Sequence, residues 1–594
     1  MYPKEMNSQF KHRLTALLLL ALVLPLISCV KPGMAAFRYG DLARNSKLWD
    51  EAIVQYDTSI GLDPTYAPAY YNRGLVYYHK MEYDRAIADF SRAIKLDDKQ
   101  LEYYLSRGKA YTLAENYTAA ISDLTTVVTI DARFTDGYFE RGYTYYVMEN
   151  YNKAVADFSK VIELDTNYKD IYFYRGNAYA AAGEYELALL DYRHELKNNP
   201  NDINTHRKIA WIYSREGNYD ESIRSYNDAM RIDPKDPRNY VSRGEMYYLR
   251  GQYDLALADF AKAIELDPNY ADAYFSRGRT YSTLLMNDKA IEDFNRAIEI
   301  NPDFYQAYIE RGRTYFLTGD SAKALADIDK SIQIAPNNAM AYNNRGKVNQ
   351  SLGKYNDAIA DYNKAIALDS SYGEAYYNRG SSYFNNGQTD LALADFDKAI
   401  ELNIDNDRYY EKRSWVYYKK GNYIRSIVDY NYYIAMNPDN AYAYYGRGNA
   451  YYNDEKYDHA LNDYNTAIRL DPNLANAYYG RANLYTTTGK YELAMGDYNK
   501  AISLNPVIST YYNKRGILHR KLGQYQEAVS DFTKAIELDP IYAWSYNNRA
   551  WTYYANAEYE KALADFTRAL QLDATLQESI RGQEKTQRVM RELF

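Results

Sequence analysis

Small, aromatic and charged residues recur along this chain with a period of 34 residues. The sequence AYYNRG of residues 69–74 returns unchanged at residues 375–380, a separation of nine times 34. With the first repeat placed at Gly33, sixteen consecutive repeats fit up to Leu576 without insertion or deletion. A period of this length is typical of solenoids built from stacked helix pairs. The sequence therefore predicts an all-α fold with sixteen repeats over residues 33–576.

Two features of each repeat predict where its helices lie. Position 8 is Gly in most repeats and position 20 is Ala or Ser, and such small residues let two helices approach closely. Position 32 is Pro in ten repeats, as at Pro64 and Pro268, and proline cannot continue a helix. Each repeat is therefore expected to hold two helices, the second of which ends near position 32.

This pattern resembles the tetratricopeptide repeat over about nine-tenths of the chain. The resemblance implies a right-handed superhelical solenoid of sixteen helix-turn-helix units. Residues 577–594 follow the last repeat and combine Arg581, Lys585 and Arg588 with the apolar Ile580. They are expected to form a C-terminal capping helix that covers the apolar face of the sixteenth repeat. A basic tail that docks a partner is the alternative.

The high tyrosine content follows from the repeat. Tyrosine supplies 72 residues, and 46 of them occupy positions 4, 11, 17 and 24. A large amphipathic ring suits a thin two-layer solenoid, because it buries apolar area while its hydroxyl reaches water. We therefore interpret the aromatic excess mostly as repeat core, and it gives no reason to expect a cofactor.

A charged pair also recurs. Position 7 is Arg in 14 of 16 repeats and position 23 is Asp in 14 of 16. The exceptions coincide, because the first repeat has Tyr39 with Gln55 and the sixth has Ile209 with Ser225. This joint loss predicts an ion pair between the two helices of every other repeat. Partly buried pairs of this kind specify geometry more reliably than they add stability.

Composition and charge disfavour several classes of function. The formal net charge is −8 and no polybasic surface stands out, so no nucleic-acid partner is expected. One Cys and six His offer little material for a thiol enzyme or a zinc site, and no two His share a helix at metal-ligand spacing. The repeats leave no room for a separate catalytic domain. We therefore expect a non-enzymatic protein without catalytic, metal-binding or cofactor-binding residues.

The N-terminal residues 1–28 differ from the repeats. Basic residues precede an apolar run over residues 14–27, which is typical of a secretory signal peptide and shorter than the roughly 20 residues of a membrane-spanning helix. The run ends in the sequence LISC at Cys29, the only cysteine, and this sequence resembles the bacterial lipobox. The resemblance implies cleavage before Cys29 and a lipid on its thiol.

Residues 29–32 would then form a lipid-anchored N-terminus. The protein is expected in the cell envelope, anchored to a bacterial membrane on its periplasmic or surface face. An uncleaved signal anchor is one alternative. A plain apolar role for Cys29, with cleavage near residues 33–35, is another.

In the tetratricopeptide family a concave groove is lined mainly by positions 2, 5, 9, 12 and 13 of the first helices. Four of the five tryptophans occupy these positions, namely Trp211, Trp415, Trp544 and Trp551. Clustered exposed aromatic residues mark binding sites, so these tryptophans are groove candidates. Large residues that merely fill gaps on a curved surface are the alternative.

Position 9 carries a basic residue in three successive repeats, at Arg279, Arg313 and Lys347. These residues would form a basic ladder along the groove that receives an acidic segment. Neutralisation by the neighbouring Asp272 and Glu310 is the alternative.

Repeats thirteen and fourteen share an uncharged groove lining of tyrosine and asparagine. It consists of Tyr442, Tyr445, Asn449, Tyr452, Asn453, Asn476, Tyr479 and Asn483. Aromatic rings and amides are what a peptide backbone or a sugar needs for binding. Tyr445 and Tyr479 are expected to lie outside the repeat core, unlike the adjacent packing residues Tyr444 and Tyr478. An ordinary surface that reflects the general richness in Tyr and Asn is the alternative.

These features predict a scaffold that binds extended segments of partner proteins or peptides in its groove. No repeat has Lys at position 5, so the two-carboxylate clamp known from the family is not expected. The alternative is a carbohydrate-handling tetratricopeptide lipoprotein of exopolysaccharide export or envelope assembly, with polysaccharide as its ligand.

Overall fold

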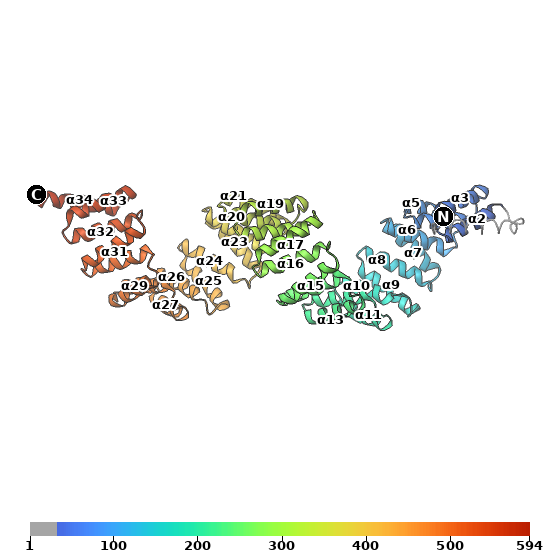
Figure 1. The fold of residues 1–594 in the computed structure, drawn as a ribbon, viewed down its shortest axis with the longest axis horizontal. Coiled ribbons are helices and arrows are strands. Elements are labelled where there is room, and N and C mark those ends of the chain that lie inside the picture. The colour runs from blue at the N-terminus through green and yellow to red at the C-terminus, as the bar shows by residue number, and fades with distance from the viewer. Residues whose placement is uncertain (1–31, 594) are drawn as a thin grey trace, which may run out of the picture. The chain divides into compact units, whose positions relative to one another are not determined.

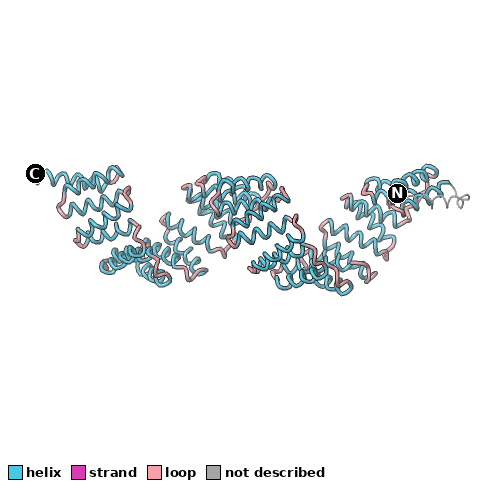
Figure 2. The backbone as a smooth tube through the Cα atoms, viewed as in Figure 1, coloured by secondary structure: helices cyan, strands magenta, loops and turns pink. Residues whose placement is uncertain are grey.

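The computed structural model describes residues 32–593, which form helices joined by short turns without any strand (Figure 1, Figure 2). The chain divides into two compact parts, with the boundary between Lys289 and Ala290. The predicted all-α fold is confirmed. The predicted signal peptide and Cys29 lie outside the described residues.

The N-terminal part contains α2 (Pro32–Asn45), α3 (Trp49–Leu62), α4 (Ala67–His79), α5 (Tyr83–Leu96), α6 (Leu101–Leu113), α7 (Tyr117–Ile130), α8 (Thr135–Val147), α9 (Tyr151–Leu164), α10 (Ile171–Ala181), α11 (Tyr185–Asn198), α12 (Ile203–Arg215), α13 (Tyr219–Ile232), α14 (Pro237–Leu249), α15 (Tyr253–Leu266) and α16 (Ala271–Thr283). The boundary falls within α17 (Asn287–Ile300).

The C-terminal part continues with α18 (Tyr305–Leu317), α19 (Ser321–Ile334), α20 (Ala339–Ser351), α21 (Tyr355–Leu368), α22 (Gly373–Asn385), α23 (Thr389–Leu402), α24 (Asp407–Lys419), α25 (Tyr423–Met436), α26 (Ala441–Asn453), α27 (Tyr457–Leu470), α28 (Ala475–Thr487), α29 (Tyr491–Leu504), α30 (Ser509–Lys521), α31 (Tyr525–Leu538), α32 (Ala543–Ala555), α33 (Tyr559–Leu572) and α34 (Gln577–Leu593).

The helix bounds follow the 34-residue period. From α4 onward the first helix of a repeat begins at position 1 and the second at position 17, except that α10 begins at Ile171. Asp170 precedes α10 with a left-handed φ of 57°. Position 15, between the paired helices, has a positive φ in all sixteen repeats, at Gly in nine of them. Glycine adopts this conformation without a steric penalty, so a left-handed residue turns each helix pair.

The repeat core is centred on position 24. The largest fully buried side chains are Tyr or Phe at this position, such as Phe90, Tyr464 and Phe566. They fit against the glycine at position 8, because a Cβ atom on Gly448 would lie only 2.9 Å from the ring of Tyr464. Large rings in the second helix therefore require small residues in the first.

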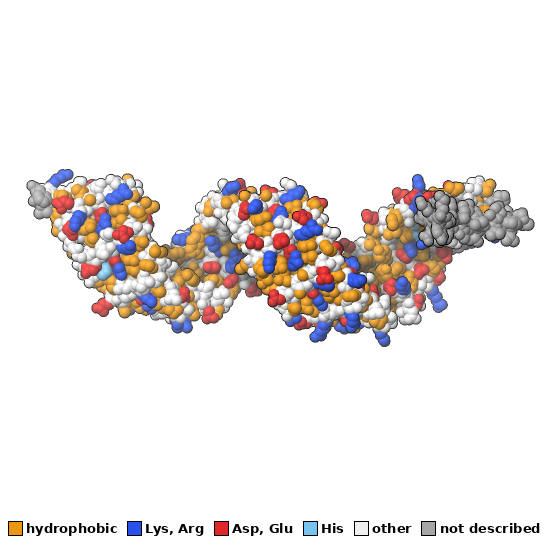
Figure 3. All heavy atoms as spheres, in the orientation of Figure 1, with side chains coloured by type: hydrophobic (Ala, Val, Ile, Leu, Met, Phe, Trp, Pro, Cys, Tyr) orange, Lys and Arg blue, Asp and Glu red, His pale blue; other side chains and the backbone are white. Residues whose placement is uncertain are grey.

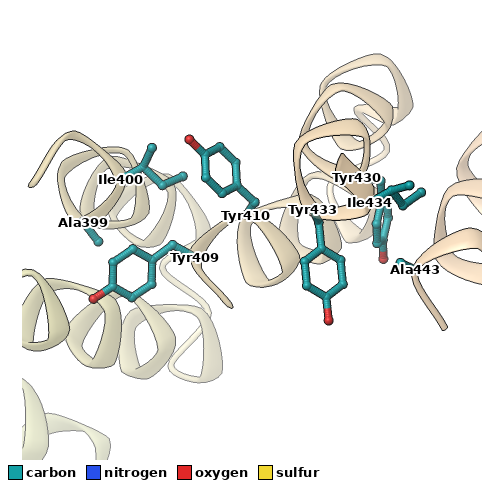
Figure 4. Packing of buried hydrophobic residues seen from close by; sticks show 8 residues of the cluster. All are labelled: Ala399, Ile400, Tyr409, Tyr410, Tyr430, Tyr433, Ile434 and Ala443. Atoms are coloured by element: carbon teal, nitrogen blue, oxygen red, sulfur yellow. The ribbon is translucent and has the colours of Figure 1, made fainter. Parts of the chain in front are cut away.

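Buried side chains also join neighbouring repeats. Figure 4 shows a cluster to which four consecutive helices, α23 to α26, contribute. In this cluster Tyr409 and Tyr410 come from α24, and Tyr430 and Tyr433 come from α25. Each repeat thus covers its neighbour, and buried clusters of this kind connect adjacent repeats.

The predicted ion pair between positions 7 and 23 is confirmed in the repeats for which contacts are described. In the thirteenth repeat, Nε and Nη2 of Arg447 each donate to the carboxylate of Asp463 over 2.8 Å. The third nitrogen, Nη1, donates to Oδ1 of Asn431 in the preceding repeat over 2.7 Å. The arginine therefore ties its own two helices to the previous repeat, and we call this arrangement the arginine clamp.

The sixth repeat lacks every part of the arginine clamp. Ile209 and Ser225 replace the ion pair, and Arg193 occupies the acceptor position of the preceding repeat. Arg207 of α12 instead turns toward α14, where Nε donates to Oδ1 of Asn239 in the next repeat over 2.7 Å. Its Nη2 donates to Asp236, the last residue of the sixth repeat. The missing ion pair is thus accompanied by a missing acceptor.

The helix α34 packs on α32 and α33 and covers the end of the sixteenth repeat. Gly582 faces the ring of Phe566, and Gln583 donates to Thr567 over 2.9 Å where other repeats carry the clamp arginine. Its exposed residues include Glu578, Arg581 and Arg588. It therefore acts as a polar end cap.

Candidate functional site

A pocket of about 370 Å³ lies among helices of the C-terminal part, where the sequence predicts the Tyr/Asn lining. The predicted residues that line it are Tyr445, Asn449, Tyr452, Asn453, Tyr479 and Asn483. Tyr442 and Asn476 do not line it. Tyr442 is 63 % exposed, and Asn476 accepts a hydrogen bond from the hydroxyl of Tyr511. We call this the Tyr/Asn pocket.

Hydrogen bonds between helices fix the walls of the Tyr/Asn pocket. The hydroxyls of Tyr464 and Tyr498 donate to Oδ1 of Asn449 and Asn483, respectively, both over 2.8 Å. Tyr452 and Thr487 share a hydrogen bond of 2.9 Å between α26 and α28. The lining is therefore held in position before any ligand arrives.

The electrostatic character of the pocket is close to neutral. Burial raises the pKa of Tyr445 and of Tyr479, and the adjacent Asn449 and Asn483 act in the opposite direction. These phenols are therefore uncharged at neutral pH. No carboxylate lines the pocket, and Lys514 of α30 is its one charged lining residue. The pocket can hydrogen-bond a polar ligand and stack on it, and it lacks the acid and base pair of a hydrolytic site.

The expectation that Tyr445 and Tyr479 lie outside the repeat core is wrong. Tyr445 is half-buried and its ring centroid lies 6.3 Å from that of Tyr464. Tyr479 is also half-buried, with the ring of Tyr511 at 4.9 Å. The reason is that position 5 faces both the groove and the next repeat.

Glycine at position 6 leaves space for a tyrosine ring of the preceding repeat. A Cβ atom on Gly480 would lie 2.7 Å from the ring of Tyr464, and one on Gly446 would lie 2.5 Å from the Tyr430 hydroxyl. Gly480 therefore lets the ring of Tyr464, from the preceding repeat, reach the pocket wall, whereas Tyr430 beside Gly446 does not line the pocket.

Several lining residues were not predicted from the sequence. They are Tyr418, Tyr464, Thr486, Thr487, Tyr498, Lys514 and Ile517. Two of them, Tyr464 and Tyr498, could have been predicted from the sequence. Each is a Tyr at position 24 that lies fifteen residues after an Asn at position 9 of the same repeat. The pair Asn177 and Tyr192 has the same spacing and the same hydrogen bond of 2.8 Å. Thr486 and Thr487 occupy groove positions 12 and 13 of the fourteenth repeat, and Tyr418 and Ile517 occupy groove positions of the adjacent repeats, so position alone could have found these four. Lys514, at position 6, could not be found in this way.

The three residues of the predicted basic ladder each lie beside a carboxylate. Arg279 pairs with Glu245 at 3.4 Å in the N-terminal part. In the C-terminal part, Arg313 pairs with Glu310 at 2.7 Å and Lys347 with Glu374 at 3.3 Å. These contacts favour the neutralised alternative over an anion-binding ladder.

The predicted tryptophans do not line the Tyr/Asn pocket. Trp415 packs edge-on against Phe384 at 4.8 Å, with the ammonium of Lys412 4.9 Å from its ring. Trp544 is 39 % exposed. Trp551 packs edge-on against Phe566 at 5.2 Å, so part of its role is structural.

Within residues 32–593, no group of three or more His, Cys, Asp or Glu side chains could hold a metal ion. No helix in this range has both the length and the apolar character required to cross a membrane. On the face of the molecule in Figure 3, basic and acidic side chains are interspersed. The Tyr/Asn pocket is the candidate binding site of the C-terminal part.

The stacked helix pairs define a helical repeat protein. Family profiles described as "TPR repeat" match residues 40–80, 244–284, 350–387 and 448–489. Profiles described as "Tetratricopeptide repeat" match residues 67–100, 135–168, 160–235, 271–304, 294–326, 328–360, 373–406, 475–506 and 506–575. These matches cover more than half of the sequence, and the chain belongs to the tetratricopeptide repeat family.

Among solved structures, the chain matches two tetratricopeptide repeat proteins and the APC/C hetero-tetramer Cut9–Hcn1. One from Parabacteroides merdae is 21 % identical, with 42 % of this chain and 98 % of that chain covered and a TM-score of 0.37. The Cut9–Hcn1 hetero-tetramer of APC/C is 13 % identical, with 74 % and 98 % covered and a TM-score of 0.40. YrrB, a protein with "an unusual peptide-binding site", is 22 % identical, with 32 % and 97 % covered and a TM-score of 0.27. No curated protein matches the chain by sequence.

Proposed function

We propose that this protein is a non-enzymatic interaction scaffold that binds an extended, largely uncharged polypeptide segment in the Tyr/Asn pocket. The observation that carries the proposal is the pocket itself, with its tyrosine rings and fixed asparagine amides and a single charged lining residue. Rings stack on apolar side chains, while amides both donate to and accept from a peptide backbone.

We further propose that the scaffold acts in a bacterial cell envelope, tethered by a lipid on Cys29. The support is the sequence of residues 1–29, in which a signal-like apolar run ends at the only cysteine. A chain tethered in this way would present its repeats to partners at the membrane surface without crossing the bilayer.

Binding is tested with Asn453→Ala combined with Thr487→Ala. Both residues are exposed, line the pocket and hydrogen-bond to the tyrosines Tyr418 and Tyr452, so their loss should lower affinity about tenfold with little change in stability. The measurement is titration of the best peptide from a peptide array, with Asn462→Ala on the outer surface of α27 as the control.

A glycan array run in parallel distinguishes the two ligand classes. Binding of glycans in the absence of any peptide binding would favour the carbohydrate-handling alternative and contradict the peptide proposal. Equal peptide affinity of the double variant and the Asn462→Ala control would show that the ligand binds elsewhere.

Lipidation is tested with Cys29→Ala. This change should abolish fatty-acid labelling of the protein and release it from membranes, because the thiol would be the attachment point. The measurement is labelling and membrane fractionation of cells that express the full chain. Retention of residues 1–28 and of membrane binding in the variant would instead indicate a signal anchor.

A further inference from the structure

The two ends of the repeat array are covered differently. The C-terminal end is closed by the polar helix α34, whereas α2 is the first helix of the described residues and contacts only α3 and α4 among the helices described after it. Repeat arrays need polar terminal caps, because an uncovered repeat interface exposes apolar surface to water. The outer face of α2 is therefore expected to be covered by a partner.

The exposure of Leu42 shows that this face is an open repeat interface. Leu42 occupies position 10 of the first repeat and is 44 % exposed. The residues at position 10 in the other fifteen repeats, from Val76 to Thr552, are all buried. Met34, eight residues before Leu42, is 39 % exposed. Arg38, which is also exposed, lies four positions after Met34 and four positions before Leu42, so the three side chains follow one ridge of α2.

The charge of this end differs from that of the whole protein. Residues 29–48 contain four basic residues and one acidic residue, Asp41. Asp41 accepts hydrogen bonds from Tyr56 and Asn72, both over 2.7 Å, whereas Arg38 and Lys47 are exposed. Removal of residues 1–28, which carry three basic residues and one acidic residue, lowers the formal net charge of the chain from −8 to −10. The net positive charge is confined to the segment that holds α2, in which Arg44 pairs with Asp41 at 3.8 Å, because the exposed Asp50 and Glu51 follow at the start of α3.

We propose that the outer face of α2 docks on an anionic lipid surface. This proposal rests on the lipid anchor at Cys29, since three residues after Cys29 the helix begins, within about 10 Å of the anchor even when the chain is fully extended. Apolar side chains at the headgroup boundary with basic residues beside them are the features by which surface helices bind acidic membranes. The lipid surface takes the place of the missing repeat.

The test uses the chain from residue 29 with Cys29→Ser, which keeps every described residue and carries no lipid. It is expected to co-sediment with vesicles of phosphatidylglycerol and phosphatidylcholine, but not with phosphatidylcholine alone, and added salt should weaken binding. Leu42→Ser and Arg38→Ser should each reduce the vesicle-bound fraction severalfold. Val54→Ser on α3 is the matched control, because Val54 is 58 % exposed but lies on another helix.

Other outcomes overturn the proposal. Absence of binding to anionic vesicles, or equal loss of binding in Val54→Ser and Leu42→Ser, would contradict docking through α2. A concentration-dependent dimer that Leu42→Ser abolishes would show that a second copy covers this face instead. Because this chain carries no lipid and no peptide, failure here is separate from failure of Cys29 labelling or of the Tyr/Asn pocket.

Discussion

Raising the pH from 10 to 12 is expected to unfold the repeat array. Burial raises the pKa of Tyr103, of Tyr430 and of Tyr511 to about 12, from an ordinary value of 10. All three side chains are more than nine-tenths buried. A group whose folded-state pKa is raised stabilises the fold fully below its unfolded pKa and loses that contribution as the pH rises through the folded pKa.

The size of this effect follows from the number of buried phenols. Each such tyrosine contributes on the order of 2 kcal/mol below pH 10, and this contribution disappears by about pH 12. Burial raises the pKa of Tyr192, Tyr362, Tyr464 and Tyr498 as well, at position 24 of other repeats. Because neighbouring repeats stabilise one another, we expect a cooperative loss of helix rather than gradual titration.

The measurement is a pH titration in which tyrosinate absorbance reports the ionisation of tyrosine and circular dichroism reports the loss of helix. Tyr103→Phe keeps the buried ring and removes the ionisable hydroxyl, so unfolding around α6 should move to higher pH. Tyr442→Phe is the control, since Tyr442 is 63 % exposed. Ionisation of all tyrosines near pH 10 with constant helix content would contradict the burial of these rings.

Much of the fold could be predicted because the repeat constrains single positions tightly. Glycine at position 8 and the Arg and Asp at positions 7 and 23 recur as the same letters, so their roles could be inferred from one sequence. The acceptor of the arginine clamp could not be inferred from the sequence. It is Asn431 or Asn465 in some repeats and Ser91 or Thr533 in others, so no single residue type marks the position.

The Tyr/Asn pocket was predicted in part for a related reason. Residues of first helices, such as Asn449 and Asn483, could be assigned to the groove by position. Tyr464 and Tyr498 were assigned to the core by the same rule, yet their hydroxyls reach the pocket and bind those asparagines. Position within a repeat predicts the location of a ring but not of the hydroxyl at its far end.

Loss of one arginine clamp is expected to destabilise its repeat strongly. In the eleventh repeat, Arg379 donates to both carboxylate oxygens of Asp395, at 2.8 and 2.7 Å, and to Asn363 of the preceding repeat at 2.6 Å. The side chains of Arg379 and Asp395 are 17 % and 8 % exposed. Arg379→Ile would leave the carboxylate buried without its partner, which costs about 3–5 kcal/mol in buried pairs.

The double variant Arg379→Ile with Asp395→Ser recreates the residues found at Ile209 and Ser225. It should be less destabilised than Arg379→Ile alone, because no unpaired charge remains in it. Hydrogen exchange of α22 and α23 measures the local free energy of opening, which suits a long array better than one global transition. Lys398→Ala, which removes an exposed pair with Glu401 on α23, should change the stability far less than Arg379→Ile does. Additive losses from Arg379→Ile and Asp395→Ser would mean that the two side chains act independently and that the paired exceptions in the sixth repeat have another cause.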